Sequence, residues 1–234
     1  MSVAENIAAI QVRIAQAAHR AGRRPEEIAL MAVSKTHPPE KIREAYAAGL
    51  RLFGENKVQE FAGKFAALKD LPDAKFQMIG HLQSNKAAKA AELFSAIDSV
   101  DSLRLAEKLN AAAAAENKQL AILIEINIAG EAAKSGIAPD SAELQALLQA
   151  APRLEHLSFR GLMTVPPIAD DPEAARPFFK RLRALRDQIA AQHLPSIGLD
   201  ELSMGMSHDF EVAIEEGSTC VRVGTAIFGK REKP

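Results

Sequence analysis

One cysteine, Cys220, is all that this chain of 234 residues contains, so no disulfide can form within it. A chain without internal disulfides fits a reducing compartment. The 29 lysines and arginines nearly balance the 30 aspartates and glutamates, and this balance gives no reason to expect a nucleic-acid partner. The sequence also lacks a polybasic block for a membrane surface and an apolar run long enough to span a bilayer. These absences favour a cytoplasmic globular protein without membrane contacts.

The N-terminal segment, residues 1–24, lacks the unbroken apolar core of a secretory signal. Val3, Ile7, Ile10 and Ile14 recur every three to four residues, which predicts an amphipathic helix of the mature protein. Hydrophobic residues make up 47% of the chain, enough for a sizeable core. No repeat or low-complexity linker divides the sequence, so we expect one domain over residues 1–234.

Short runs typical of β-strands alternate with helical segments along the chain. The predicted strands cover residues 28–34, 51–56, 75–80, 95–100, 120–127, 157–165, 201–206 and 220–228. Units of roughly 25 residues, each a strand and a helix, predict an α/β fold, a single (β/α)8 TIM barrel with an extra N-terminal helix. An open doubly wound sheet is the alternative.

Polar residues follow most of the predicted strands. In a barrel, ligands bind at the C-terminal ends of the strands. The residues at these ends are Lys35, Glu55, Asn56, His81, Asn127, Met163, Thr164, Ser203 and residues 222–225. So much hydrogen-bonding capacity on one face predicts a binding site there.

Lys35 follows directly after the apolar run "IALMAVS", residues 28–34, and Pro38 and Pro39 come soon after it. A lysine at a strand end can simply extend its ammonium group into water. At a barrel mouth it can also lose part of its hydration and act as an amine nucleophile toward a carbonyl. The residues alone leave both interpretations open.

Two glycine-containing segments, "SMGMS" and "RVGTAIFG", follow the last two strands. Gly224 allows close approach of the backbone to a ligand, and Thr225 offers an N–H and a hydroxyl. Ser203, Gly205 and Ser207 add similar groups. Barrels often hold a phosphate after strands seven and eight, which we expect here unless these are ordinary glycine turns. No Walker pattern or GxGxxG motif supports nucleotide binding.

The remaining candidates carry weaker signals. A histidine after a strand, such as His81, is more often structural than catalytic. His208 and Asp209 have no second cluster at metal-ligand spacing, so no metal site is expected. Cys220 falls within a predicted strand and is interpreted as core. Tyr46, the only tyrosine, falls on the first helix after a strand.

Taken together, these motifs resemble those of one family. The segments "AVSKTHPPEKIREAYAAGLRLFGENKVQE", "IGHLQSNK", "LIEINIAGEAAKSGI", "RGLMTVPP" and "LSMGMSHDFEVAIEEGSTCVRVGTAIFG" resemble the YggS/PROSC group of pyridoxal 5'-phosphate (PLP) binding proteins. The match extends from Ile28 to Gly229 and is weakest in the N-terminal helix and in residues 170–195.

The resemblance implies a barrel similar to the N-terminal domain of alanine racemase. Lys35 would form an aldimine with PLP, and Arg222 would face the pyridine nitrogen. The resemblance also implies phosphate-holding residues at Ser203, Gly224 and Thr225, and pocket-lining residues at Asn56, His81 and Met163.

The resemblance further implies a role in vitamin B6 homeostasis, in which the protein would hold or buffer PLP or deliver it to PLP-dependent apo-enzymes. A cationic Arg222 at the ring nitrogen disfavours protonation there and weakens the cofactor as an electron sink. The related racemase takes a second acid/base, a tyrosine, from an added domain and a partner subunit. Tyr46 is predicted far from the barrel mouth, and no added domain is expected. We therefore expect a carrier without robust turnover. A monomer is favoured because no long apolar helix seam is left unassigned.

Three alternatives remain open. The chain could be an amino-acid racemase or another PLP enzyme, or a Schiff-base aldolase that binds a phosphorylated sugar. It could also be a regulatory module that contacts a protein through basic residues, namely Lys86, Lys89, Arg104 and Lys108.

Overall fold

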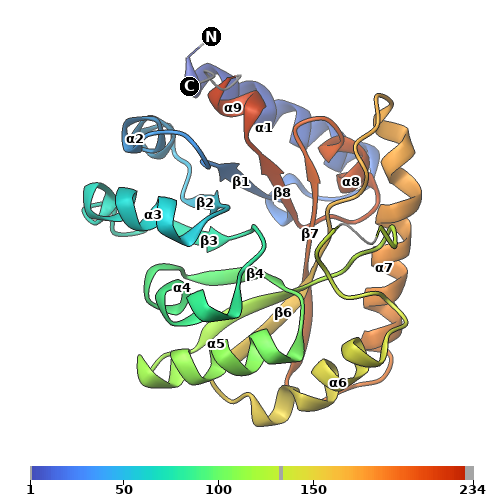
Figure 1. Cartoon of the computed structure of the whole chain (residues 1–234). Coiled ribbons are helices and arrows are strands. Elements are labelled where there is room, and N and C mark those ends of the chain that lie inside the picture. Colours follow the sequence, from blue (N-terminus) through green and yellow to red (C-terminus); the bar gives the residue numbers. More distant parts are fainter. Residues whose placement is uncertain (1, 132–133, 230–234) are drawn as a thin grey trace.

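The strands close into a single barrel (Figure 1). The structure is a computed structural model, and it describes residues 2–131 and 134–229. Neighbouring strands run parallel in chain order, and the first also pairs with the last, Ala29 opposite Cys220. The strands are β1 (Ala29–Val33), β2 (Leu52–Glu55), β3 (Lys75–Met78), β4 (Ala96–Val100), β5 (Leu120–Glu125), β6 (Leu157–Met163), β7 (Ile197–Met206) and β8 (Cys220–Val223). This closure confirms the predicted (β/α)8 barrel.

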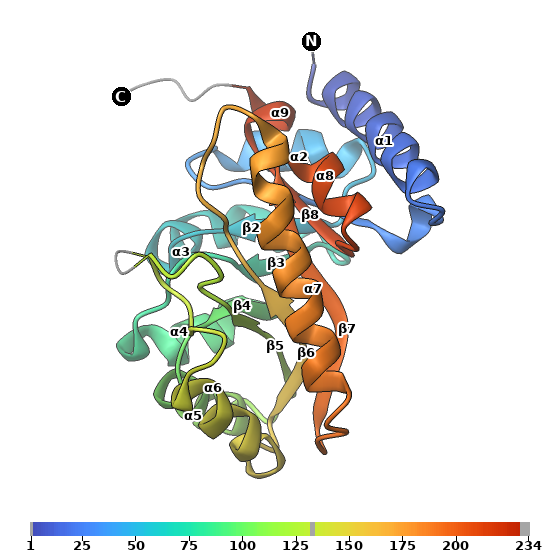
Figure 2. The ribbon, with the colours of Figure 1, turned by 90° about the vertical axis from the view of Figure 1, so that its right-hand side faces the viewer.

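Helices surround the barrel between successive strands, and α7 runs along the length of β7 (Figure 2). The helices are α1 (Val3–Arg20), α2 (Pro39–Ala47), α3 (Val58–Phe65), α4 (Ala87–Leu93), α5 (Leu103–Ala115), α6 (Ala142–Ala150), α7 (Arg176–Ala190), α8 (Phe210–Glu215) and α9 (Thr225–Phe228). Among the residues described, no helix has both the length and the apolar character needed to cross a membrane.

Two elements differ from the sequence-based prediction. The expected strand 220–228 ends at Val223, and Thr225–Phe228 form α9 instead. The amide groups of Ile227 and Phe228 donate to the carbonyl of Gly224, which closes the helical turn. Strand β7 begins at Ile197, four residues before the expected start, because Ile197 pairs with Phe159 of β6 ahead of a shift in register.

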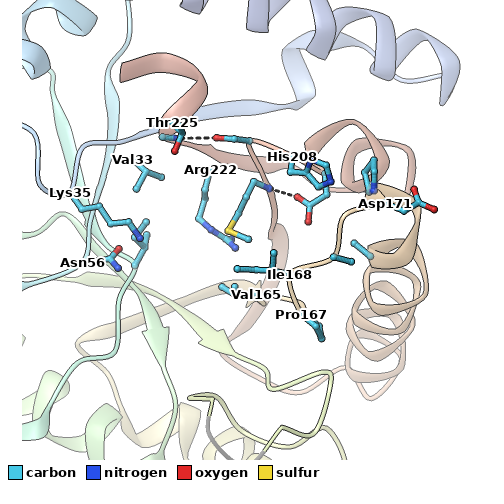
Figure 3. A pocket seen from close by; sticks show the side chains of 18 of the residues that line it. Val33, Lys35, Asn56, Val165, Pro167, Ile168, Asp171, His208, Arg222 and Thr225 are labelled. Carbon is cyan, nitrogen blue, oxygen red and sulfur yellow. Dashed lines mark hydrogen bonds between the residues drawn. The ribbon is translucent and has the colours of Figure 1, made fainter. Parts of the chain in front are cut away.

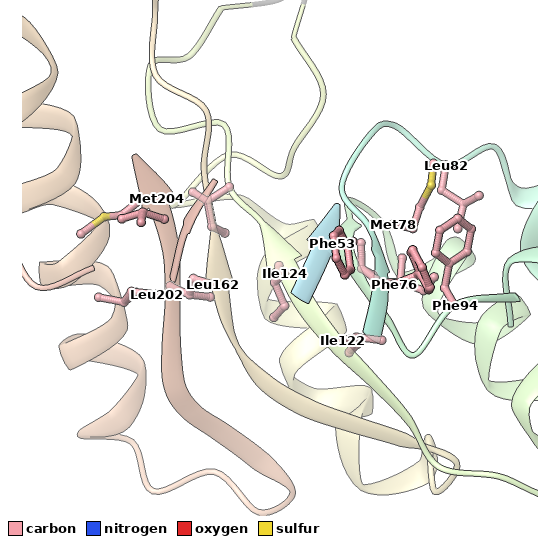
Figure 4. Close-up of a cluster of buried hydrophobic side chains, with 14 of the residues drawn as sticks. Phe53, Phe76, Met78, Leu82, Phe94, Ile122, Ile124, Leu162, Leu202 and Met204 are labelled. Carbon is pink, nitrogen blue, oxygen red and sulfur yellow. The ribbon is translucent and has the colours of Figure 1, made fainter. Parts of the chain in front are cut away.

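The core between strands and helices is largely apolar (Figure 4). Phe61 of α3 lies 4.7 Å from Phe76 and 4.8 Å from Phe94, measured between ring centroids. Phe53 stacks on Phe76 from the neighbouring strand. Aromatic pairs at such distances add stability beyond the apolar area that they bury. This cluster fastens α3 and α4 to β2 and β3.

The N-terminal helix α1 packs on α8 and α9. Its buried stripe consists of Val3, Ile7, Ile10, Ile14, Ala17 and Ala18, which includes the four residues predicted from spacing. Ser2 and Glu5 form a capping box at its start. The side-chain amide of Asn6 donates to the carbonyl of Ile227 at 2.8 Å, so α1 directly supports α9.

Candidate functional site

A cavity of about 490 Å³ opens at the C-terminal ends of the strands (Figure 3). Residues from β1, β7 and β8 and from the segments after β1, β2, β3, β6, β7 and β8 surround it. Its lining comprises Val33, Lys35, His37, Asn56, Ile79, Val165, Pro167, Ile168, Ala169, Asp171, Pro172, Ala175, Met206, Ser207, His208, Asp209, Arg222, Gly224 and Thr225. This is the end of the barrel at which the sequence predicts a ligand.

Lys35 is the second residue after β1, and Asn56 is the first residue after β2. Because β1 and β2 pair in parallel, with Val33 opposite Gly54, their following residues reach the same side of the cavity. Figure 3 shows the two side chains close together, with Arg222 between them and the far wall. The lysine is therefore partly buried inside the mouth instead of extending from the surface.

The turn after β7 shapes the opposite wall. Just before this turn, Gly205 near the end of β7 has φ +93°, a left-handed conformation that side chains rarely adopt, and it lies where the register between β7 and β8 shifts. The amide of Met206 donates to Asp209 Oδ1 at 2.6 Å, which holds the turn closed. Ser207 consequently faces the cavity, where its Oγ accepts a 3.3 Å hydrogen bond from the amide of Gly224.

Arg222 occupies the floor of the cavity and is almost fully buried. Its Nη1 donates to Ser203 Oγ and its Nη2 donates to the carbonyl of Thr164, each at 2.7 Å. Two charge-assisted hydrogen bonds fix the plane of the guanidinium group. Burial lowers the pKa of Arg222 from its usual value, and nearby acidic groups oppose that effect.

Buried acidic groups interact electrostatically with the guanidinium group of Arg222. Asp98 of β4 is fully buried, and burial raises its pKa well above the usual value of a carboxyl. Burial likewise raises the pKa values of Glu201 and of the Cys220 thiol. Cys220 is therefore a buried, protonated core residue, as its position in a strand predicts.

The structure brings five of the predicted site residues to the cavity: Lys35, Asn56, Arg222, Gly224 and Thr225. It places the other three elsewhere. His81 is exposed and its Nδ1 lies 3.0 Å from Asp101 Oδ2. Met163 is fully buried at the end of β6, and Ser203 is fully buried as the partner of Arg222. Ser207, four residues later, is the serine that reaches the cavity.

The segment after β6 also lines the cavity, which the sequence did not predict. Val165, Pro167 and Ile168 form an apolar wall, and the Ile168 side chain is 94% exposed at the rim. His208 faces this wall, with its Nε2 2.8 Å from the carbonyl of Asp170. The Pro166-Pro167 pair is a signal for an irregular segment after a strand, but it does not indicate which way the segment folds.

The cavity combines an amine, hydroxyl and amide donors, and a fixed cation. These groups suit a ligand with a carbonyl carbon, an anionic group and a planar acceptor. No group of three or more metal-ligating side chains occurs in the part of the chain that the structure describes.

The chain is similar in sequence to known proteins along nearly its whole length. Residues 6–232 match the family model described as "Alanine racemase, N-terminal domain". A protein named "Pyridoxal phosphate homeostasis protein" from Aquifex aeolicus is 44% identical over 99% of this chain and 100% of the relative. A protein of the same name from Pseudomonas aeruginosa is 47% identical over 99% of this chain and 96% of the relative.

Solved structures show the same fold. PipY from Synechococcus elongatus, determined with PLP bound, superposes with a TM-score of 0.84 at 39% identity and covers 97% of this chain and 100% of its own. Alanine racemase from Clostridium difficile superposes with a TM-score of 0.75 at 14% identity. The match covers 98% of this chain and 58% of the racemase, and it shows a common fold.

Proposed function

This chain belongs to the family of pyridoxal phosphate homeostasis proteins, which share the alanine racemase N-terminal domain, and from that premise we propose that it binds PLP and acts in vitamin B6 homeostasis. The proposal depends on one observation: Lys35 lines the same cavity as Ser207 and Gly224, which are joined by a hydrogen bond. An amine for an aldehyde and donors for a phosphate are what PLP requires.

Lys35 is the group that we propose attaches to the cofactor. Its Nζ would add to the aldehyde carbon, a C=N bond would replace the C=O bond, and one water molecule would leave. The hydroxyls of Ser207 and Thr225 and the backbone of Gly224 would hold the phosphate. Asn56 lies beside the lysine and would contact the same end of the ligand.

We assign the phosphate contact to Ser207 and a supporting role to Ser203. Ser203 lies within β7 and accepts from Arg222, so it acts by orienting the guanidinium group. Two measurements separate these roles. Ser207→Ala should weaken affinity for PLP and leave affinity for pyridoxal, which has no phosphate, nearly unchanged. Ser203→Ala should affect both ligands alike, and the reverse pattern would overturn the assignment.

The position of Arg222 favours a protein that carries the cofactor and does not use it for demanding catalysis. When bound, PLP supplies an electron sink, which is strongest with a protonated ring nitrogen beside an acidic group. A buried guanidinium group at that position would disfavour the protonated form. The only tyrosine, Tyr46, donates its hydroxyl to Asp73 on the outside of the barrel and is not part of the cavity lining. It therefore does not supply a second acid/base at the site.

One observation favours a second candidate, an amino-acid racemase. Racemisation requires acid/base groups on two faces of the substrate, and Lys35 and His208 line the cavity from its two sides (Figure 3). Incubation with single enantiomers of amino acids, followed by chiral chromatography, distinguishes the candidates. Turnover that disappears in both Lys35→Ala and His208→Ala would establish the racemase.

We further propose a cytoplasmic monomer that passes PLP to apo-enzymes. The single cysteine fits a reducing compartment, and it is buried. In residues 2–131 and 134–229, the exposed large hydrophobic side chains are Val12 and Ile168, which lie in separate places and form no extended apolar patch. Size-exclusion chromatography with light scattering tests the oligomeric state.

The central experiment is a titration with PLP followed by visible absorbance. The wild-type protein should develop the absorbance of a covalently attached cofactor, and Lys35→Ala should not. Lys89→Ala, which changes an exposed lysine paired with Glu92 on α4, serves as the matched control and should behave as wild type. A wild-type protein that develops no such band with excess PLP would defeat the proposal.

A further inference from the structure

The residues on both sides of Lys35 are held by one network of charged side chains, which is buried at Glu55 and Lys64. Ser34, the preceding residue, is fully buried. Its Oγ donates to Glu55 Oε1 at 2.8 Å, and its carbonyl accepts from Lys64 Nζ at 3.1 Å. The amide of Ser34 also donates to the carbonyl of Gly54 in the neighbouring strand.

Thr36, the following residue, has an unusual backbone conformation. Its φ is +66°, in the left-handed region, where residues other than glycine are uncommon. Its amide donates to Glu60 Oε1 at 2.6 Å, a short hydrogen bond to a carboxylate. Unfavourable backbone conformations persist where the surrounding structure enforces them, and they concentrate at functional sites.

Lys64 of α3 connects these two attachments. Its ammonium group lies 3.1 Å from Glu55 Oε1 and 2.6 Å from Glu60 Oε1, so one cation bridges the carboxylates that hold Ser34 and Thr36. The Lys64 side chain is 11% exposed and that of Glu55 is fully buried. Burial would raise the pKa of Glu60, but hydrogen bonds from Lys64 and from the Thr36 amide lower it below the usual value.

We propose that Lys64, acting through Glu55 and Glu60, is a positioning residue that fixes the backbone of Lys35 so that its side chain enters the cavity. This inference rests on the proposed function, in which Lys35 attaches to PLP. Lys64 itself is not part of the cavity lining, so it would act only through the backbone on each side of Lys35.

The alternative is that the network merely fastens α3 to the barrel. Apolar side chains of similar volume often do this as well as a buried ion pair. Phe61 on the same helix already packs in the aromatic cluster. The network is directed instead at the residues next to Lys35, since Lys64 and both carboxylates each have a hydrogen bond to Ser34 or Thr36.

Lys64→Met tests the proposal, because methionine keeps much of the length of the side chain and removes its charge. In the cofactor-free protein, the Thr36 amide should exchange with solvent faster than in wild type. On addition of PLP, the rate constant for development of the visible band should fall by about 10- to 100-fold, since small misplacements of a reacting group carry penalties of this size. Lys89→Met should change neither quantity.

Two further variants cover a failure of Lys64→Met to fold. Glu60→Gln keeps an oxygen acceptor for the Thr36 amide and should slow attachment less than Lys64→Met does. The double variant Glu55→Gln/Lys64→Met leaves no isolated buried charge and should still attach PLP slowly. Attachment at the wild-type rate by the double variant would refute the inference.

The controls separate this inference from the proposed function. If wild type binds PLP and Lys64→Met loses thermal stability with unchanged exchange at Thr36 and an unchanged attachment rate, the positioning role is refuted and the function stands. If wild type develops no band, the proposed function is refuted. In that case the exchange rate of Thr36 still reports on the network alone.

Discussion

Replacing Gly205 with alanine should destabilise the barrel and weaken PLP binding together. Gly205 has φ +93°, and a Cβ atom there would lie 2.5 Å from the Cβ of Ala213 and 3.0 Å from the Cα of Phe210. The end of β7 and helix α8 would therefore have to move apart. Ser207 and Asp209 lie in the turn that follows β7, so the wall proposed to hold the phosphate would move with Gly205.

Three contributions determine how much the free energy of unfolding changes in Gly205→Ala. A left-handed conformation costs an ordinary residue about 1–2 kcal/mol. Overpacking costs about 1–3 kcal/mol. Alanine also restricts the unfolded chain more than glycine does, which stabilises the folded state by about 0.4–1 kcal/mol and offsets part of these costs. The free energy of unfolding of Gly205→Ala should therefore fall by about 1–5 kcal/mol.

Gly49→Ala is the matched control, because Gly49 has φ +97° with no heavy atom within 4 Å of an added Cβ. It carries the same strain without the overlap. In urea unfolding, the two variants should differ by about 1–3 kcal/mol, which is the steric contribution alone. Titration with PLP should show weaker binding for Gly205→Ala only. Equal stability and equal affinity of the two variants would refute this account of the turn.

Three other outcomes are expected. Gly63→Ala, on α3 with open space around it, should raise the free energy of unfolding by about 0.5–1 kcal/mol in urea titrations. Phe61→Ala should lower it by about 3–5 kcal/mol, since the ring is fully buried between Phe76 and Phe94. Hydrogen bonds from Arg176 lower the pKa of Glu215. The resulting stabilisation is present above the pKa of the glutamate in the unfolded chain, about 4.3. It is lost as the pH falls through the lower pKa of Glu215 in the folded protein. Thermal melts from pH 7 to pH 3 should therefore drop less steeply for Glu215→Gln than for wild type.

The barrel could be predicted from sequence because each strand is a short apolar run between helical segments of regular spacing. The errors occur where local sequence favours two structures. "CVRVGTAIF" is mostly apolar and contains four β-branched residues, yet its second half forms α9 after Gly224. The early start of β7 depends on the pairing of Ile197 with Phe159, a contact between distant segments that local sequence does not encode.

The site could be predicted less completely than the fold. A position at a strand end indicates that a residue lies near the mouth, which located Lys35, Asn56 and Arg222. It does not say whether the side chain reaches the cavity, and Met163 is fully buried without being part of the cavity lining. Ser203 and Ser207 flank the same glycine, and the geometry of the turn after Gly205 decides which of them faces the ligand.

The pairing of β1 with β8 also constrains how the molecule matures. Lys35 follows the first strand, whereas Gly224 and Thr225 follow the last, so the two halves of the cavity come together only when the ring of strands is sealed. A ribosome-bound intermediate still lacking β8 would have the lysine without the opposite wall. Contacts between such distant segments form slowly. PLP would thus bind only after the barrel has folded, and a nascent chain would not bind PLP from the cell.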